Sequence, residues 1–498
     1  MKKIFLIFPD EIGTINPEVY GHFAEHIGGV IYDGIWVGKD SKVPNINGFR
    51  KDLVEAFKKL DPPVIRWPGG CFAETYNWRD GIGKNRPTTL GWWSSSDFRY
   101  ESNEMGTHEF LDFCELVGAK PYIAANISSI PPLEMRNYFD YCMSPRGSTS
   151  LAGEREKNGR PEPWNIPYWG IGNETWIGGG NMEPDEYAHE YRKYAVIAGN
   201  VFGDYKLIAC GPNDCDVYWT RKFMEVFERS EKKMHGFSLH FYCMNLDKNA
   251  VDFTKDEWYQ QMKQANNMDA IIKKHWGLIQ GFNMEQHAKL VIDEWGCWHQ
   301  GGSGPSKGYN LFEQQSTVRD AVVAAITLNI FNNNCEKIMM ANAAQLVNNL
   351  HCLFLAGGEN FILTPTYHVF DMYKGHMGAT AIKAIAQTDT LECRFGENDI
   401  RTVESLSVSA SYKDDDVLIT IANLSADHEA VISLESVGEI LDPNAEFTIL
   451  THEDFRAHNT FEFPDMVMPE TKSVNISRPI TLPPASASRI KAKMLRPL

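Results

Sequence analysis

The chain has 498 residues, more than one hydrophobic core usually supports, so its length predicts one large domain and a smaller one. Lys and Arg number 48 against 65 Asp and Glu, and the net charge of -17 argues against nucleic acid or an acidic membrane surface as a partner. The composition is otherwise that of a globular protein, and no apolar stretch approaches the length of a membrane span.

The ten cysteines indicate a reducing compartment. They form no Cys-x-x-Cys pair, and several, such as Cys114, Cys210 and Cys335, lie in apolar runs typical of buried free thiols. The apolar run at the N-terminus is too short for a signal peptide and is followed by no cleavage site of small residues. We therefore expect a cytoplasmic protein.

Eight short apolar or β-branched segments each finish in a polar or glycine-rich cluster, and most are followed by a stretch of helical period. This alternation is typical of βα units. The segments are Glu18 to Glu25, Pro63 to Cys71, Lys120 to Asn126, Tyr168 to Glu174, Lys206 to Gly211, Gly236 to Tyr242, Lys289 to Glu294 and Lys337 to Gln345.

The intervening helices carry their own signals. Apolar residues from Phe110 to Val117 recur at helical spacing, with Thr107 as the predicted N-cap and Gly118 as the terminator. A second helix is expected before Asp61-Pro62-Pro63, and Pro184 is expected to open a third that ends near Gly199.

An open doubly wound sheet would carry a glycine-rich phosphate loop after an early strand, and the sequence has none. We therefore predict an α/β fold with a closed (β/α)8 barrel over residues 16–385. Residues 386–498 change to short alternating strands, which predict an antiparallel, jelly-roll-like β-sandwich joined by the N-terminal strand 1–15. Within it, Asp454 to Ser473 is expected to be a long surface loop.

Two of the barrel strands end in a carboxylate: Tyr168 to Glu174 is the fourth predicted strand and Lys289 to Glu294 the seventh. Side chains at the C-terminal ends of barrel strands point into one pocket, so Glu174 and Glu294 are expected to face each other. The sequence shows no metal-ligand cluster and no cofactor motif, and a pair of facing carboxylates alone is typical of enzymes that cleave glycosidic bonds. We predict Glu174 as acid/base and Glu294 as nucleophile, about 5–5.5 Å apart as in retaining enzymes.

Several blocks of sequence then resemble the α-L-arabinofuranosidases of glycoside hydrolase family fifty-one. They are Gly172-Asn173-Glu174, Asp293-Glu294-Trp295, Tyr20 to Gly29, Ile35 to Gly38, Arg66 to Phe72, Ser238 to Tyr242 and Ala341 to Asn348. The resemblance covers about residues 15 to 350 closely, and the remainder only in architecture. It implies release of terminal α-L-arabinofuranosyl residues from arabinan, arabinoxylan or derived oligosaccharides.

The resemblance also implies which residues hold the sugar. Matching positions give Glu25, Cys71, Asn173, Tyr242 and Gln345 as substrate-binding residues, with Asn126 and Trp298 as further candidates. His240 is assigned a supporting role that orients a neighbouring group. By analogy with the family, the protein is also expected to be a homo-oligomer.

Other interpretations of these residues remain open. Glu25 lies between His22 and His26, but the order is not that of a zinc motif, so no metal is expected. The alternative role for Glu25 is a buried ion pair with Arg66 or with a histidine. The competing functions are an endo-β-glucanase or xylanase using the same carboxylates, and a non-catalytic carbohydrate-binding barrel. The segments Thr175 to Gly180 and Gly296 to His299 depart from the family pattern, which leaves the preferred polymer open.

Overall fold

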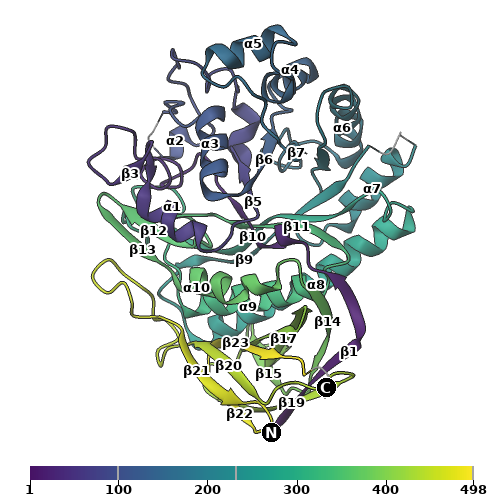
Figure 1. Ribbon diagram of the computed structural model, residues 1–498, viewed down its shortest axis with the longest axis vertical. Coiled ribbons are helices and arrows are strands. Elements are labelled where there is room, and N and C mark those ends of the chain that lie inside the picture. The colour runs from purple at the N-terminus through teal and green to yellow at the C-terminus, as the bar shows by residue number, and fades with distance from the viewer. Residues whose placement is uncertain (98–99, 230–232, 496–498) are drawn as a thin grey trace. The chain divides into compact units, whose positions relative to one another are not determined.

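The computed structural model describes residues 1–97, 100–229 and 233–495 (Figure 1). The chain forms two compact units, which are described separately here. Unit 1 contains Met1–Tyr20, Tyr242–Ile272 and Trp295–Leu498, and unit 2 contains Gly21–Phe241 and Lys273–Glu294. Within the described residues, no helix is both long enough and apolar enough to cross a membrane.

Eight strands close into a barrel in the order β10-β11-β2-β5-β6-β7-β8-β9. The pairs from β2 to β9 are parallel, which confirms the predicted (β/α)8 class. The barrel strands are β2 (Gly21–Phe23), β5 (Val64–Trp67), β6 (Lys120–Ala125), β7 (Tyr168–Ile171), β8 (Lys206–Ala209), β9 (Gly236–Asn249), β10 (Lys289–Gln300) and β11 (Ile338–Ala344).

Each of these strands coincides with one of the eight predicted segments, although the ends differ. The first prediction extends too far, because Pro17–Tyr20 is the 3-10 helix η1 and only Gly21–Phe23 is strand. Likewise Cys71 begins the 3-10 helix η2 (Cys71–Thr75) and does not continue β5. The predictions for β9 and β10 instead stop too early, because these strands continue beyond Tyr242 and Glu294.

The helices are α1 (Lys51–Lys58), α2 (Ser94–Asp97), α3 (Thr107–Val117), α4 (Pro132–Met143), α5 (Ser150–Lys157), α6 (Pro184–Ala198), α7 (Val217–Phe227), α8 (Lys255–Gly281), α9 (Val318–Asn332), α10 (Pro365–Tyr373) and η3 (Lys374–His376). Helix α3 ends at Gly118 with a φ of 81°, as predicted, but its N-cap is Gly106. The prediction of Thr107 was wrong because Glu109 accepts a hydrogen bond from Gly106 N at 3.0 Å, while the Thr107 hydroxyl contacts Tyr138 Oη.

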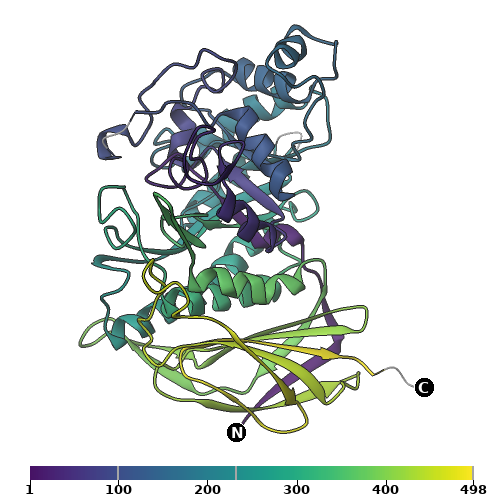
Figure 2. The same cartoon turned by 60° about the vertical axis from the view of Figure 1, so that its left-hand side comes forward.

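The strand-rich part of unit 1 is one nine-stranded sheet in the order β21-β20-β23-β18-β17-β14-β1-β19-β22. Its strands are β1 (Lys2–Thr14), β14 (Thr380–Ala386), β17 (Leu406–Lys413), β18 (Asp416–Asn423), β19 (Ala430–Val437), β20 (Asn444–Leu450), β21 (Glu470–Asn475), β22 (Ile480–Leu482) and β23 (Ser486–Lys493). Residues from eight of these strands bury one shared apolar core, so the sheet curves around it. Figure 2 shows most of these strands in yellow-green below the green helices, with the N-terminal strand β1 in purple.

Two details of this sheet differ from the sequence-based expectation. Strand β1 pairs antiparallel with β14 but parallel with β19, so the sheet is not purely antiparallel. The predicted loop Asp454 to Ser473 ends early, because β21 begins at Glu470 and pairs with β20. Strand β21 is almost wholly exposed and carries no apolar alternation, which is why its sequence did not reveal it.

Three two-stranded sheets complete the fold. They are β3 (Asn45–Ile46) with β4 (Phe49–Arg50), β12 (Phe354–Gly357) with β13 (Asn360–Leu363), and β15 (Thr390–Arg394) with β16 (Ile400–Glu404). None of these hairpins was expected from the sequence.

Candidate active site

The turn after β7 brings Asn173 and Glu174 to the end of the strand. Gly172 has a φ of 84°, and a Cβ there would lie 2.7 Å from Ile127 Cδ1, so the turn requires glycine at this position. Glu174 itself has a φ of 41°, an uncommon conformation for a residue with a side chain. Such local strain is found where the surrounding structure fixes a functional side chain.

A buried carboxylate supports this turn from below. Glu74, in η2, accepts hydrogen bonds from Asn173 N at 2.6 Å, Ile127 N at 3.1 Å and Ser128 N at 3.0 Å. Burial raises the pKa of Glu74 to about 7, although the three backbone donors oppose that shift. Glu74 thereby ties the turn after β7 to the loop after β6.

Glu294 is held by a buried arginine. Arg66, from β5, donates from Nη1 to Glu294 Oε1 at 2.8 Å and from Nη2 to Asn173 Oδ1 at 2.6 Å. Only 1% of the Arg66 side chain and 8% of the Glu294 side chain is exposed, so the guanidinium is the charge that compensates this carboxylate. The arrangement favours an ionised Glu294.

Asp293 precedes Glu294 and is also buried. Its Oδ2 accepts a hydrogen bond from Tyr122 Oη at 3.0 Å and lies 3.9 Å from Arg66 Nε. Burial raises the pKa of Asp293, and the charge of Arg66 acts against the rise. Tyr122 and Asp293 thus fix the position of the Arg66 guanidinium from a second side.

Glu174 lies in a different environment from Glu294. Its Oε1 is 2.9 Å from His240 Nδ1, its Oε2 is 3.6 Å from Cys71 Sγ, and 19% of its side chain is exposed. His240 Nδ1 also lies 3.6 Å from Glu294 Oε2. One side-chain oxygen from each glutamate and a ring nitrogen of His240 lie within 4.8 Å of one another.

The histidine between the two glutamates carries charge more readily than an ordinary one. Burial lowers the pKa of His240, but the charges of Glu294 and Glu174 and the hydrogen bond to Glu174 outweigh it, so the pKa is raised overall. The three side chains could also serve as donors to a cation. The separation of the two carboxylates suits the retaining geometry better than the wider inverting one.

Two further predicted residues lie in unit 2. Glu25 is buried and accepts hydrogen bonds at 3.0 Å from both Phe72 N and Trp93 Nε1. Asn126 donates from its amide to Ser129 Oγ in its own loop and to Tyr76 O after η2, and it accepts from Ser128 N and Ser129 N. Its role as a sugar ligand stays a prediction.

The remaining predicted residues belong to unit 1. The Tyr242 and Trp298 rings meet edge to face with centroids 5.2 Å apart, and Trp298 also contacts Phe312. Gln345 is buried and directly follows β11. Tyr242 and Trp298 therefore form one aromatic pair, whereas Gln345 lies in the segment after β11.

Comparisons with known proteins agree with this geometry. The family profile "Alpha-L-arabinofuranosidase 1 domain" matches residues 56–266, and "Alpha-L-arabinofuranosidase C-terminal domain" matches residues 293–486. An intracellular exo-α-L-arabinofuranosidase of Bacteroides ovatus is 38% identical over 473 residues, which are 93% of this chain and 90% of that protein. The crystal structure of the GH51 arabinofuranosidase from Xanthomonas axonopodis pv. citri superposes with a TM-score of 0.92 at 36% identity, covering 99% of this chain and 100% of that one.

The chain belongs to the α-L-arabinofuranosidases of glycoside hydrolase family fifty-one. A further structure, the Thermotoga maritima α-L-arabinofuranosidase in complex with arabinose, has a TM-score of 0.87 at 28% identity and covers 99% of this chain and 100% of that one. The resemblance inferred from the sequence blocks is therefore confirmed.

Sequence reasoning missed several residues that support this family fifty-one site. Arg66 stood within a quoted block and Asp293 beside Glu294, but neither was given a role in positioning the carboxylates. Tyr122 and Glu74 were not singled out. The available signal for Glu74 was a carboxylate directly after the apolar residues Phe72 and Ala73, because a buried charge needs partners.

Proposed function

We propose that the protein is an exo-acting, retaining α-L-arabinofuranosidase that releases terminal arabinofuranosyl residues from arabinan, arabinoxylan or derived oligosaccharides. The observation that carries the proposal is the unequal setting of two neighbouring glutamates in a family fifty-one barrel. Glu294 is paired with Arg66, whereas Glu174 contacts a histidine and a thiol and is more exposed.

This inequality assigns the two roles. A nucleophile must be ionised when the substrate binds, and the Arg66 guanidinium at 2.8 Å favours the ionised form of Glu294. An acid/base must exchange protons with the leaving group and with water, and Glu174 is the more accessible of the pair. We therefore take Glu294 as the nucleophile and Glu174 as the acid/base.

The reaction then runs in two displacements. Glu174 protonates the glycosidic oxygen while a carboxylate oxygen of Glu294 attacks the anomeric carbon, so the leaving alcohol departs and a covalent glycosyl-enzyme forms. Glu174 next takes a proton from water, whose oxygen attacks the same carbon and frees Glu294. His240 lies 2.9 Å from Glu174 and 3.6 Å from Glu294, so it contacts both carboxylates as their charges change during the reaction.

The substrate-binding roles are part of the same proposal. We assign Glu25, Cys71, Asn173, Tyr242 and Gln345 to the arabinofuranosyl unit, with Asn126 and Trp298 as further candidates. In support, Asn173 Nδ2 lies 3.8 Å from Cys71 Sγ, and Cys71 contacts Glu174, so these two residues adjoin the acid/base.

We also propose a cytoplasmic, homo-oligomeric protein with a barrel and a sandwich that includes the N-terminal strand 1–15. The boundary expected between residues 385 and 386 falls inside β14, which pairs with β1 and β17, so we place the start of the sandwich at Thr380. The ten free cysteines and the intracellular Bacteroides ovatus relative support the cytoplasmic location. The pairing of β1 with β14 and β19 supports the place of the N-terminal strand. Light scattering on the purified full chain measures the oligomeric state.

The alternative enzymes have weaker support. A Paenibacillus polymyxa xyloglucanase of family 44 and the glucanase-xylanase CelM2 share only 11% and 12% identity with this chain, at TM-scores of 0.62, which indicates a common fold alone. A non-catalytic binding barrel would not need to keep both carboxylates. Both are present and adjacent.

The test is hydrolysis of aryl α-L-arabinofuranoside beside aryl β-glucoside and aryl β-xyloside by wild type, Glu174→Ala and Glu294→Ala. We expect wild-type turnover of the arabinofuranoside only, and a loss of roughly 10³-fold or more in each variant. Preference for either β-glycoside, or wild-type rates in both variants, contradicts the proposal.

A further inference from the structure

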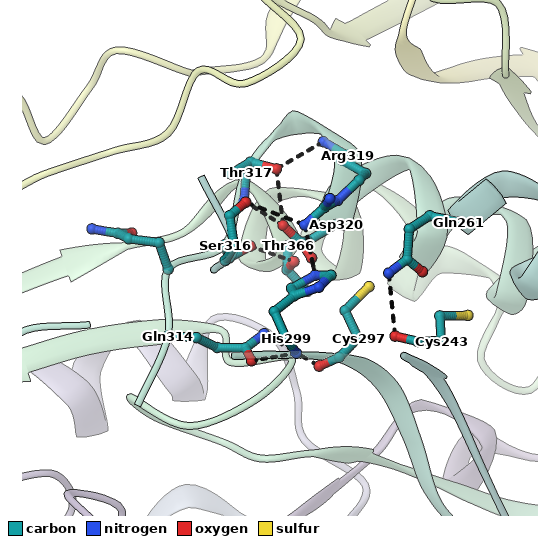
Figure 3. Close-up of polar contacts among 12 residues, drawn as sticks. Cys243, Gln261, Cys297, His299, Gln314, Ser316, Thr317, Arg319, Asp320 and Thr366 are labelled. Atoms are coloured by element: carbon teal, nitrogen blue, oxygen red, sulfur yellow. Dashed lines mark hydrogen bonds and ion pairs between the residues drawn. The ribbon is translucent and has the colours of Figure 1, made fainter. Parts of the chain in front are cut away.

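A second group of chemistry-bearing side chains lies in unit 1 and has no role in the proposed reaction. Cys297 and His299 are two residues apart on β10, so they point to the same side of the strand. Asp320 lies in the first turn of α9, and His351 lies in the segment between β11 and β12. Figure 3 shows Cys297 and His299 directed toward the start of α9, where Thr317, Arg319 and Asp320 lie.

These side chains converge within ligand distance of one another. One ligand atom each from Cys297, Asp320 and His351 lies within 4.8 Å of the other two, and all three residues are buried. His299 Nε2 is 3.1 Å from Asp320 Oδ1. A thiol, a carboxylate and two imidazoles therefore share one interior region.

The protein alone does not satisfy this group. Among the residues that the structure describes, neither ring nitrogen of His351 has a hydrogen-bond partner, although the side chain is fully buried. A buried imidazole without any polar partner is costly unless something else occupies its lone pair.

His299 shows a second conflict. Its Nε2 lies 2.7 Å from Arg319 Nη2, which can only donate, and 3.1 Å from Asp320 Oδ1, which can only accept when ionised. One ring nitrogen cannot accept from Arg319 and donate to Asp320 at the same time. A cation between His299 Nε2 and Asp320 Oδ1 would accept a lone pair from each atom and so resolve the conflict.

The backbone is shaped to bring His351 into place. Gly296, next to Cys297, has a φ of 145°, and a Cβ there would lie 2.3 Å from the Cβ of His351. Only glycine allows the segment after β11 to approach β10 this closely. The approach places the unpartnered imidazole beside the thiol.

We propose that Cys297, Asp320 and His351, with His299 as the fourth donor, form a binding site for a structural zinc ion. Thiolate, imidazole and carboxylate are the ligands that zinc takes in four-coordinate sites. With metal–ligand bonds of about 2.0–2.3 Å, tetrahedral geometry sets neighbouring donors about 3.4–3.6 Å apart. The Asp320–His299 spacing of 3.1 Å is near this value. The ligand atoms of Cys297, Asp320 and His351, which lie within 4.8 Å of one another, must draw closer together around the ion.

Binding balances in charge at the ligands. The Cys297 thiol loses its proton to solvent, so one thiolate and the Asp320 carboxylate neutralise the divalent ion. Arg319 gives up its contact with His299 and keeps its position over the Phe253 ring, 3.7 Å from the ring centroid, and its hydrogen bond to Ala250 O. The ion would join β10, α9 and the segment after β11, beside Trp298.

Metal content and cobalt spectroscopy on the full-length protein test this proposal. After chelation and dialysis against zinc, wild type should retain about one equivalent, whereas Cys297→Ala and His351→Gln should lose at least tenfold in affinity. Cys352→Ala is the matched control, because Cys352 is a buried thiol next to His351 whose Sγ lies 3.8 Å from Gln314 O. It should bind like wild type.

Cobalt distinguishes this site from the glutamates of the active site. Co²⁺ bound to a thiolate gives a sulfur-to-metal charge-transfer band, which Cys297→Ala should abolish and Cys71→Ser should leave intact. Zinc should also raise the Tm of wild type and Cys352→Ala but not of Cys297→Ala.

Absence of stoichiometric metal in zinc-dialysed wild type overturns the proposal, whatever the variants do. So does equal binding by wild type, Cys297→Ala and His351→Gln, or loss of the cobalt band in Cys71→Ser alone.

Discussion

Replacing Arg66 tests how the protein keeps its nucleophile ionised. Arg66→Met removes the guanidinium that lies 2.8 Å from Glu294 and 3.9 Å from Asp293, so both buried carboxylates lose the charge of the arginine. At an effective dielectric constant of about 20, the 2.8 Å contact alone corresponds to about 6 kcal/mol of attraction. Desolvation offsets part of this, so the net loss on breaking such a pair is about 3–5 kcal/mol.

That loss should appear in the kinetics as a pH effect. With less support for the charged form, a larger fraction of Glu294 is protonated at neutral pH, and kcat/KM should fall by roughly 10²–10⁴-fold. The acidic limb of the kcat/KM profile should move to higher pH, so the deficit should shrink as pH rises. Arg66→Lys keeps the charge but not the two-pronged contact with Glu294 and Asn173, and should fall between wild type and Arg66→Met.

Arg155 is the matched control for this experiment. It is equally buried but donates to the backbone carbonyls of Tyr141, Arg160 and Pro161. Arg155→Met should lower the free energy of unfolding and leave the shape of the pH profile unchanged. If Arg66→Met loses activity equally at all pH values, or if Arg155→Met moves the acidic limb as far, the reasoning about Glu294 is refuted.

Three further predictions follow from the same site. Gly172→Ala should lower kcat at least tenfold, because the new Cβ would clash with Ile127. The control is Gly147→Ala, where φ is 72° and, among the described residues other than its chain neighbours, no atom lies within 4 Å of the new Cβ. It should lower the free energy of unfolding only by the backbone strain of about 1–2 kcal/mol, measured by denaturation. The pKa of His240 is raised in the folded chain, so the charged ring stabilises the protein most at low pH. The Tm of wild type should exceed that of His240→Asn most below about pH 6.5, and the difference should shrink as pH rises through the raised pKa. A Tm difference that grows with pH contradicts this prediction. Burial raises the pKa of Glu74 from 4.5 to about 7, so the folded wild type becomes less stable as pH rises between these values. Its free energy of unfolding in urea should fall by up to about 3 kcal/mol relative to that of Glu74→Gln. A difference that does not change with pH contradicts this prediction.

The sequence was most informative about the barrel. Buried parallel strands leave a clear trace of short apolar runs, and all eight were found because helices of period 3.6 separate them. The pattern placed some strand ends too late, since Cys71 begins a 3-10 helix and Asn126 and Glu174 lie beyond their strands. It placed others too early, since β9 and β10 continue past Tyr242 and Glu294. Periodicity cannot distinguish the last residue of a strand from the first residue of a polar loop.

The supporting side chains of the site were harder to predict. The roles of Arg66 and Glu74 depend on contacts 228 and 99 residues away in the chain, to Glu294 and to Asn173 N. The pairing of β1 with β14 and β19 is equally distant in sequence. Local pattern carries no information about such contacts, which arise only when the closed sheet brings its strand ends together.

The convergence of Cys297, Asp320 and His351 shows the same limit. Cys297 and His299 stood out only as part of an unfamiliar loop after the second glutamate, and the expectation of no metal was based on the histidines around Glu25. Asp320 matches a helix capping box with Thr317, and that role alone would account for it. Only the folded chain brings His351 next to Cys297 and Asp320.

Azide rescue of Glu294→Ala tests most directly the claim that Glu294 attacks the anomeric carbon and Glu174 moves the proton. With an activated aryl α-L-arabinofuranoside, proton NMR should show β-L-arabinofuranosyl azide, because azide enters from the face that the carboxylate has vacated. Glu174→Ala should give the α-azide, formed from a covalent intermediate. An α-azide from Glu294→Ala, or the same anomer from both variants, would contradict the assignment of the two glutamates.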